Sequence, residues 1–202
     1  AVQALGLDPD LLQVALVQFV VLYRPGWKAQ MSTRAGDYVT LRRLREEVGN
    51  DACRFFYMLR KCDQHLDFDL DLATSQSNDN PVFYIQYAFA RICSLLSLWG
   101  GDQEQLAATD LGLLGSAHEL ALAARLGAFP DVVDNAAEEL APHLIAFYLR
   151  DLAAEFHSYY NAERLLVDDP ALRNARVAMA AAVRQVIGSG MRLLAVTCPQ
   201  SM

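Results

Sequence analysis

The most regular apolar pattern in the chain lies between residues 80 and 98. Apolar side chains recur there every three or four positions, at Val82, Ile85, Phe89, Ile92 and Leu96. This spacing places them on one face of a helix, which has to be buried against other helices. Asn80 can cap the first backbone N–H groups, and Pro81 suits the first helical position. The pattern predicts a long core helix.

Later stretches have the same helical spacing, over residues 116–127, 130–140 and 142–161. Pro130 and Pro142 fall at the starts of these stretches, where proline is tolerated. A long alanine-rich helix is predicted from Ala171 to Ile187, and Gly188-Ser189-Gly190 predicts its interruption. The fold class is therefore mainly α, with five or six helices that lean antiparallel and form a bundle.

A different pattern precedes the bundle. Residues 13–23 are a dense run of β-branched and aromatic residues that predicts a strand, and residues 27–32 can return as a short second strand. Such a hairpin is not stable alone, so we expect it to be the tail of a larger sheet domain. Two helices are predicted over residues 40–49 and 50–60, and the alternation over residues 66–72 predicts an extended segment that enters a helix.

Composition narrows the possible functions. The 202 residues have a net charge of −7, which argues against non-specific nucleic-acid binding, so no DNA partner is expected and any RNA site must be local. The four cysteines are widely spaced and indicate neither a metal site nor a disulfide framework. No apolar run approaches a membrane span and no signal peptide is recognised, so we expect a cytoplasmic monomer without a membrane partner.

The flank of the predicted core helix carries a candidate RNA site. Tyr84, Tyr87 and Arg91 share this flank, and their π faces and guanidinium can stack unpaired bases and hold phosphate. Composition alone favours a half-buried tyrosine edge with a solvated arginine. A second alternative is an all-α protein-interaction module whose aromatic row docks a partner helix.

Several motifs resemble those of a known family. Residues 76–92 carry Asn-Pro-Val-Phe-Tyr-Ile-Gln-Tyr-Ala-Phe-Ala-Arg-Ile and closely resemble the junction segment of bacterial arginyl-tRNA synthetases, which are class I enzymes. Residues 65–73 and 147–161 resemble further segments, and residues 171–176 lie where the family has its Asp-Ala-Leu-Arg-type signature. The resemblance implies the C-terminal part of such an enzyme: the end of a Rossmann-type catalytic domain (residues 1–78) and a helical anticodon-binding domain (79–202).

The resemblance also assigns a nucleotide loop. Small and hydroxyl residues over 30–36 can cradle phosphate, but from the residues alone this stretch is read as a linker. In the family the corresponding loop closes over ATP and stabilises charge on the pyrophosphate. The matching positions include Met31, Ser32 and Arg34. Gln30 and Thr33 stand where the family has lysines, and we expect Arg34 or Lys28 to compensate in part.

The resemblance further implies the reaction and the partners. The complete enzyme uses ATP to join arginine to its tRNA, and Mg²⁺ accompanies the ATP. The upstream catalytic half, itself a partner, is missing here, and the chain lacks an initiator Met. We therefore expect a fragment that is inactive alone and holds no bound cofactor. The residues expected to face the anticodon loop are Tyr84, Tyr87, Arg91, Tyr159, Tyr160 and Met202.

Two other features stay open or look structural. Basic side chains gather in the two helices between residues 40 and 61, where they either form a solvated face paired with Glu46 and Glu47 or contact the inner corner of a tRNA. His157 lies near Glu155, but no nucleophile accompanies them. A hydrogen-bonded histidine on the helix surface is therefore predicted.

Overall fold

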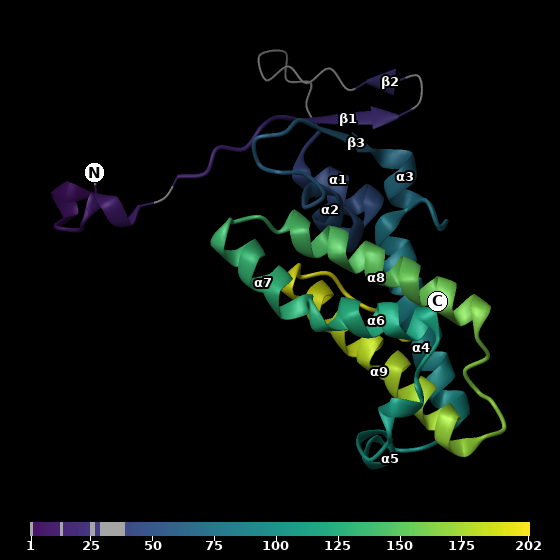
Figure 1. Cartoon of the computed structure of the whole chain (residues 1–202). Coiled ribbons are helices and arrows are strands. Elements are labelled where there is room, and N and C mark those ends of the chain that lie inside the picture. The colour runs from purple at the N-terminus through teal and green to yellow at the C-terminus, as the bar shows by residue number, and fades with distance from the viewer. Residues whose placement is uncertain (1, 13, 25–26, 29–38) are drawn as a thin grey trace.

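The computed structural model describes residues 2–12, 14–24, 27–28 and 39–202. A small sheet with three short helices precedes a larger helical bundle (Figure 1). Two short 3-10 turns, Gln3–Leu5 and Pro9–Leu11, lie at the N-terminal end, away from both. The mainly helical fold with a hairpin ahead of it confirms the predicted fold class.

The sheet has three strands in the order β2-β1-β3. β1 (Val20–Arg24) pairs antiparallel with β2 (Trp27–Lys28), which is the predicted hairpin, and parallel with β3 (Leu66–Asp69). The strand was predicted to begin at residue 13, but it begins at Val20, where pairing with β3 starts. Upstream of that point the apolar side chains are exposed, as at Phe19 (81%).

Three helices cover this sheet. α1 (Leu41–Val48) and α2 (Asn50–Tyr57) form the predicted helical hairpin, and α3 (Leu70–Thr74) follows β3 directly. The hydroxyl of Thr40 caps α1 by accepting from the Arg43 N–H at 3.2 Å. Phe55 and Phe68 are fully buried between these helices and the sheet.

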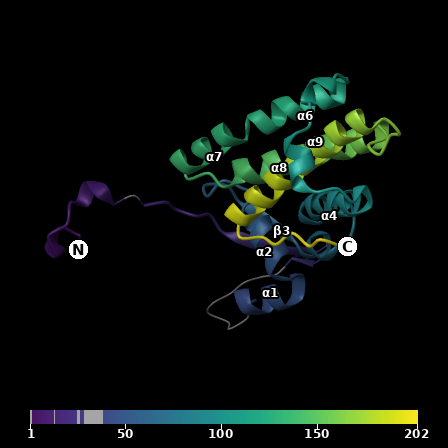
Figure 2. The same cartoon turned by 90° about the horizontal axis from the view of Figure 1, so that it is seen from below.

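Three long helices form the centre of the bundle: α4 (Pro81–Trp99), α8 (His143–Ala162) and α9 (Pro170–Leu193). Each packs against the other two. α6 (Ala117–Gly127) and α7 (Phe129–Glu138) cover α8 on the side away from α4 (Figure 2). The short α5 (Gln103–Ala107) and the 3-10 turn Leu111–Leu113 pack against α9.

The start of α4 is fixed by Asn80, as predicted. Its side-chain oxygen accepts from the Val82 N–H at 3.2 Å, while its amide donates to the Ser75 carbonyl at 2.8 Å. Asn80 is only 3% exposed, and Val82, Ile85 and Ile92 are buried along the predicted stripe. This cap ties the bundle to the segment that leaves α3.

By length and composition alone, α4 is one helix among the described residues that could cross a membrane. The prediction that no apolar run approaches such a span was therefore wrong. The stripe that raises its apolar content is the face buried in the bundle. A core helix passes the same test of length and composition.

The predicted interruption after Ile187 is absent, because α9 continues through Gly188 and Gly190 to Leu193. A Cβ built on Gly190 would lie 2.7 Å from Leu149 Cδ2, and one on Gly188 would lie 3.3 Å from Phe89 Cε2. These glycines therefore let α9 approach α8 and α4 closely instead of ending the helix. Sequence reasoning weighed their low helix propensity and missed their contact role.

We predict that Gly190→Ala destabilises the chain by about 1–3 kcal/mol, because the added methyl group overpacks a fully buried contact with Leu149. Gly127→Ala is the matched control, since a Cβ there meets nothing within 4 Å and alanine is the better helix former. Urea unfolding measures both. Equal stability of G190A and wild type would show that the contact has room for a methyl group.

Candidate nucleic-acid interface

The structure brings four of the predicted residues together with one that was not predicted. Tyr84, Tyr87 and Arg91 of α4 meet His157 and Tyr160 of α8, and we call these five residues the α4–α8 cluster. α4 and α8 are distant in sequence but lie side by side. The spacing within α4 was visible in the sequence, whereas the contribution of α8 depends on the packing of the two helices.

The guanidinium of Arg91 lies at the centre of the cluster. Its Cζ is 4.8 Å from the ring centroid of Tyr87 and 4.6 Å from that of Tyr160, which is within cation–π range. Nη2 also donates to the Tyr87 hydroxyl at 3.0 Å. The half-buried tyrosine edge that composition favours is present, but Arg91 is packed between two aromatic rings and is only partly solvated.

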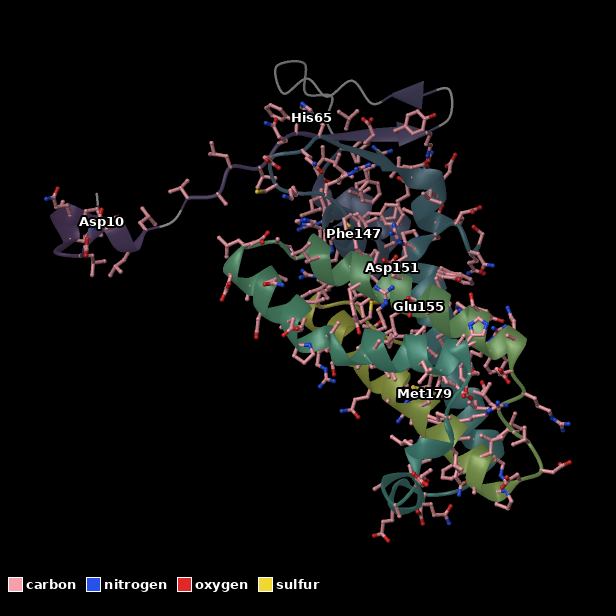
Figure 3. All side chains as sticks on the ribbon, viewed as in Figure 1. Asp10, His65, Phe147, Asp151, Glu155 and Met179 are labelled. Atoms are coloured by element: carbon pink, nitrogen blue, oxygen red, sulfur yellow. The ribbon has the colours of Figure 1, made fainter. Side chains whose placement is uncertain are left out.

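His157 is the member that sequence reasoning placed differently. It is only 6% exposed, so the prediction of a surface histidine was wrong, although the predicted hydrogen bonding is present. Its ring packs against Tyr84 and Tyr87, with centroid distances of 4.6 and 5.4 Å. Glu155, labelled in Figure 3, belongs to a different contact, because it accepts from Arg125 Nε of α6 at 2.9 Å.

Hydrogen-bond chemistry fixes the protonation of His157. Arg91 Nη1 lies 3.2 Å from Nδ1, and a guanidinium can only donate, so Nδ1 accepts. Nε2 lies 3.4 Å from the Tyr84 carbonyl, which can only accept, so Nε2 carries the proton. Burial lowers the pKa of His157, and the Arg91 charge lowers it further against the opposing effect of the Tyr84 carbonyl. The imidazole is therefore neutral.

The cluster is accessible at its edge. Tyr84, Tyr87, Arg91 and Tyr160 are all half-buried. Phe83, which sequence reasoning did not select, stacks nearly parallel to Tyr87 at 6.3 Å between centroids and is also half-buried. The flank of α4 thus presents stacked aromatic edges beside a fixed cation.

Tyr159 does not belong to this surface, and its placement at an RNA contact is contradicted. The side chain is fully buried and its hydroxyl donates to Glu119 Oε1 at 3.3 Å. Burial, together with the Glu119 carboxylate, raises the pKa of Tyr159. Two adjacent tyrosines therefore have opposite roles, since Tyr160 reaches the cluster and Tyr159 points into the core.

A buried ion-pair network holds the end of α8 that carries Tyr160. Arg176 of α9 donates to Glu119 at 3.0 Å and to Glu163 at 2.9 Å, and Glu119 also accepts from the Gly115 and Ser116 N–H groups at 2.9 Å. Burial alone would raise the pKa of Glu119, but these hydrogen bonds and the Arg176 charge outweigh it and lower the pKa. The network joins the start of α6 to α8 and α9.

The C-terminal tail also contacts α4. Gln86 Nε2 donates to the Thr197 carbonyl at 2.9 Å and to Asp51 at 3.2 Å. Arg54 of α2 donates to the Leu194 carbonyl at 3.2 Å. Met202 is 54% exposed, and the chain end lies beside α4 in Figures 1 and 2. The tail is thus held against the helix that carries the cluster.

The residues of the predicted nucleotide loop, Met31, Ser32, Thr33 and Arg34, lie outside the described residues. Lys28 is described as a strand position in β2. Within the described part of the chain, no three metal-binding side chains gather into a group.

The basic residues of α1 and α2 remain accessible. Arg42, Arg43 and Arg45 are exposed, as are Arg60 and Lys61 after α2. Glu47 pairs with Arg24 of β1 instead of with an arginine of its own helix.

The fold and the cluster define a class of protein. Residues 85–202 match the DALR anticodon binding domain family, and this match covers more than half of the chain. The chain therefore belongs to that family of helical domains. The matched region contains α8, α9 and most of α4, including Tyr87 and Arg91 of the cluster.

Individual relatives are arginyl-tRNA synthetases, which confirms the resemblance. All 202 residues align at 69% identity with the arginine–tRNA ligase of Aromatoleum aromaticum, of which they cover 34%. A Campylobacter jejuni structure assigned as an arginyl-tRNA synthetase has a TM-score of 0.87 at 30% identity, over 99% of this chain and 43% of that one. The Thermus thermophilus arginyl-tRNA synthetase has a TM-score of 0.68 at 31% identity, over 84% and 29%. The chain spans about a third of the length of the curated relatives it matches.

We predict that Glu119→Gln lowers the free energy of unfolding at pH 7 by about 1–3 kcal/mol, because it weakens the charged contact with Arg176. Since the folded pKa of Glu119 is lowered, its contribution is present above the ordinary value of 4.5 and is lost as the pH falls through the folded pKa. The variant should therefore lose less stability on acidification than wild type.

Glu138→Gln is the control for this comparison, because Glu138 is exposed. Chemical unfolding at pH 7 and pH 4 measures all three proteins. If E119Q and E138Q behave alike, the buried network does not stabilise the bundle.

Proposed function

We propose that this chain is the tRNA-binding part of an arginine–tRNA ligase and that the α4–α8 cluster, with the C-terminal tail, binds the anticodon loop. The observation that carries the proposal is the fixed position of Arg91 between Tyr87 and Tyr160 at an accessible edge. The match to an anticodon-binding family over the same helices supports it.

The chemistry of the cluster suits single-stranded RNA. Bases in a loop can be splayed out and stacked on aromatic side chains, and each such contact is worth roughly 1–3 kcal/mol. Tyr87 with its stacked neighbour Phe83 offers the most extended aromatic edge. Arg91 uses two of the five donors of a guanidinium for Tyr87 and His157, which leaves donors for a phosphate oxygen.

We also propose RNA contacts outside the α4–α8 cluster, at Met202 and at the basic side chains of α1. We place Met202 beside the cluster because the tail is bonded to Gln86 of the same helix. A chain of net charge −7 attracts RNA only where cations gather, and Arg42, Arg43 and Arg45 are candidates for the inner corner of the tRNA.

The complete protein would attach arginine to its tRNA. In that proposal ATP is a substrate, Mg²⁺ accompanies it, and the loop containing Met31, Ser32, Thr33 and Arg34 lies over the nucleotide with help from Lys28. Residues 1–78 end the catalytic domain and residues 79–202 form the anticodon-binding domain. We further propose a cytoplasmic monomer that needs its upstream catalytic half for activity.

We predict that Tyr87→Ala and Arg91→Ala each weaken binding of arginine tRNA about tenfold or more, because one removes a stacking face and the other a phosphate contact. Tyr87→Phe keeps the ring and should lose much less. Arg184→Ala removes the same charge from α9, where Arg184 lines a cavity with Phe89 and Leu96 of α4, and should bind like wild type. Fluorescence anisotropy at two salt concentrations measures all four variants.

The salt dependence separates this function from a protein-interaction module. Affinity for RNA falls as salt rises and should favour arginine tRNA over an unrelated tRNA. Wild-type affinity in both Y87A and R91A would contradict the site. An affinity that changes neither with salt concentration nor with the identity of the tRNA would instead favour the protein-interaction module.

A further inference from the structure

We propose that His157 is a positioning residue for Arg91, and that its protonation releases Arg91 and weakens RNA binding at acidic pH. This inference rests on the proposed function, because it assumes that Arg91 contacts RNA. It assigns a role to the one member of the α4–α8 cluster that is buried and cannot itself reach a ligand.

The first step is the direction of the Arg91–His157 hydrogen bond. Arg91 donates through Nη1, so His157 Nδ1 has to keep its lone pair. The opposite ring nitrogen is committed to the Tyr84 carbonyl of α4. The His157 ring therefore bonds the Arg91 side chain through one nitrogen and the Tyr84 carbonyl through the other. Both hydrogen bonds are compatible with a neutral imidazole that carries its proton on Nε2.

The second step is what a proton on Nδ1 would do. An imidazolium and a guanidinium offer only donors, so their hydrogen bond is lost, and two like charges at this distance repel. The Nε2 contact with Tyr84 survives protonation, because that nitrogen already donates. The His157 ring therefore stays in place and Arg91 is the group that moves. After the hydrogen bond to His157 is lost, the contacts that remain to orient Arg91 are the Tyr87 hydroxyl and the rings of Tyr87 and Tyr160.

Among the residues that the structure describes, no carboxylate of any packed helix is among the groups that shift the pKa of His157, and Arg91 is the one charged group that does. From α4 the groups that face the ring are Tyr84, Tyr87 and Arg91, and from α8 the neighbouring rings are Phe156 and, across the guanidinium, Tyr160. The carboxylates nearest in sequence are engaged elsewhere: Glu155 pairs with Arg125, and Glu163 pairs with Arg176. Protonation thus adds a charge beside Arg91 without a partner for it.

The direction of the pH effect is unusual. Acidification makes an acidic chain less negative, which by itself strengthens its attraction to RNA. Release of Arg91 acts in the opposite direction. Because burial and Arg91 lower the pKa of His157 below its ordinary value of 6.5, the neutral ring is retained at pH 7.5 and is lost as the pH falls through the folded pKa.

The test measures binding of an RNA oligonucleotide with the anticodon stem–loop of arginine tRNA, by fluorescence anisotropy at pH 7.5 and at the lower pH at which an NMR titration of the ring shows His157 to be protonated. Wild type should bind about fivefold more weakly at the lower pH. His157→Asn keeps an acceptor for Arg91 but cannot be protonated, so its affinity should stay near wild type at pH 7.5 and should not fall on acidification. His157→Phe keeps an aromatic ring without an acceptor and should bind weakly at both pH values.

The outcomes separate this inference from the proposed function. If Y87A and R91A both bind like wild type at pH 7.5, the proposed site is wrong, and if R91A alone does, Arg91 is not an RNA contact and this inference fails with it. If Arg91 is required but wild type and H157N have the same pH profile, the role of His157 is overturned. A ¹⁵N NMR spectrum of the histidine rings at pH 7.5 provides an independent check on wild type, since a proton on Nδ1 of His157 would also refute the inference.

Discussion

The structure depends on the three-way packing of α4, α8 and α9. Each of these helices buries a face against the other two, and the approach of α9 is close because Gly188 and Gly190 present no side chain to Phe89 and Leu149. Protein interiors are close-packed, so a shift of one helix is transmitted to the helices that it contacts. The relative position of α4 and α8 is therefore fixed by the core, and with it the distance between Arg91 and the rings on α8.

Polar contacts at the rim of the bundle refine this arrangement. Asn80 fixes where α4 begins, the Glu163–Arg176 pair holds the end of α8, and Gln86 holds the C-terminal tail. The Asn80 contacts are local and buried or half-buried, whereas the Arg176 and Gln86 contacts join segments that are farther apart in the sequence. The α4–α8 cluster lies among these three anchors, so its side chains are oriented before any ligand arrives, which reduces the entropy that binding costs.

The sequence predicted the elements better than the contacts between them. Periodicity located the bundle helices within a few residues, because an apolar stripe and a cap are local signals. It failed at Gly190, where the deciding partner is Leu149 on another helix. It also failed to separate Tyr159 from Tyr160, since adjacent residues on a helix point 100° apart and only the packing shows which one is buried. The place of His157 beside Arg91 was hidden for the same reason.

The central claim is that the edge of the α4–α8 cluster is the RNA-binding surface. Backbone amide chemical-shift mapping of the chain, titrated with the anticodon stem–loop of arginine tRNA, tests it most directly. The account predicts that the perturbed amides cluster in α4 around residues 83–91, in α8 around residues 157–160 and in the last residues of the tail. Perturbations confined to α1 and α2, or to the cavity on the other side of α4, would contradict it.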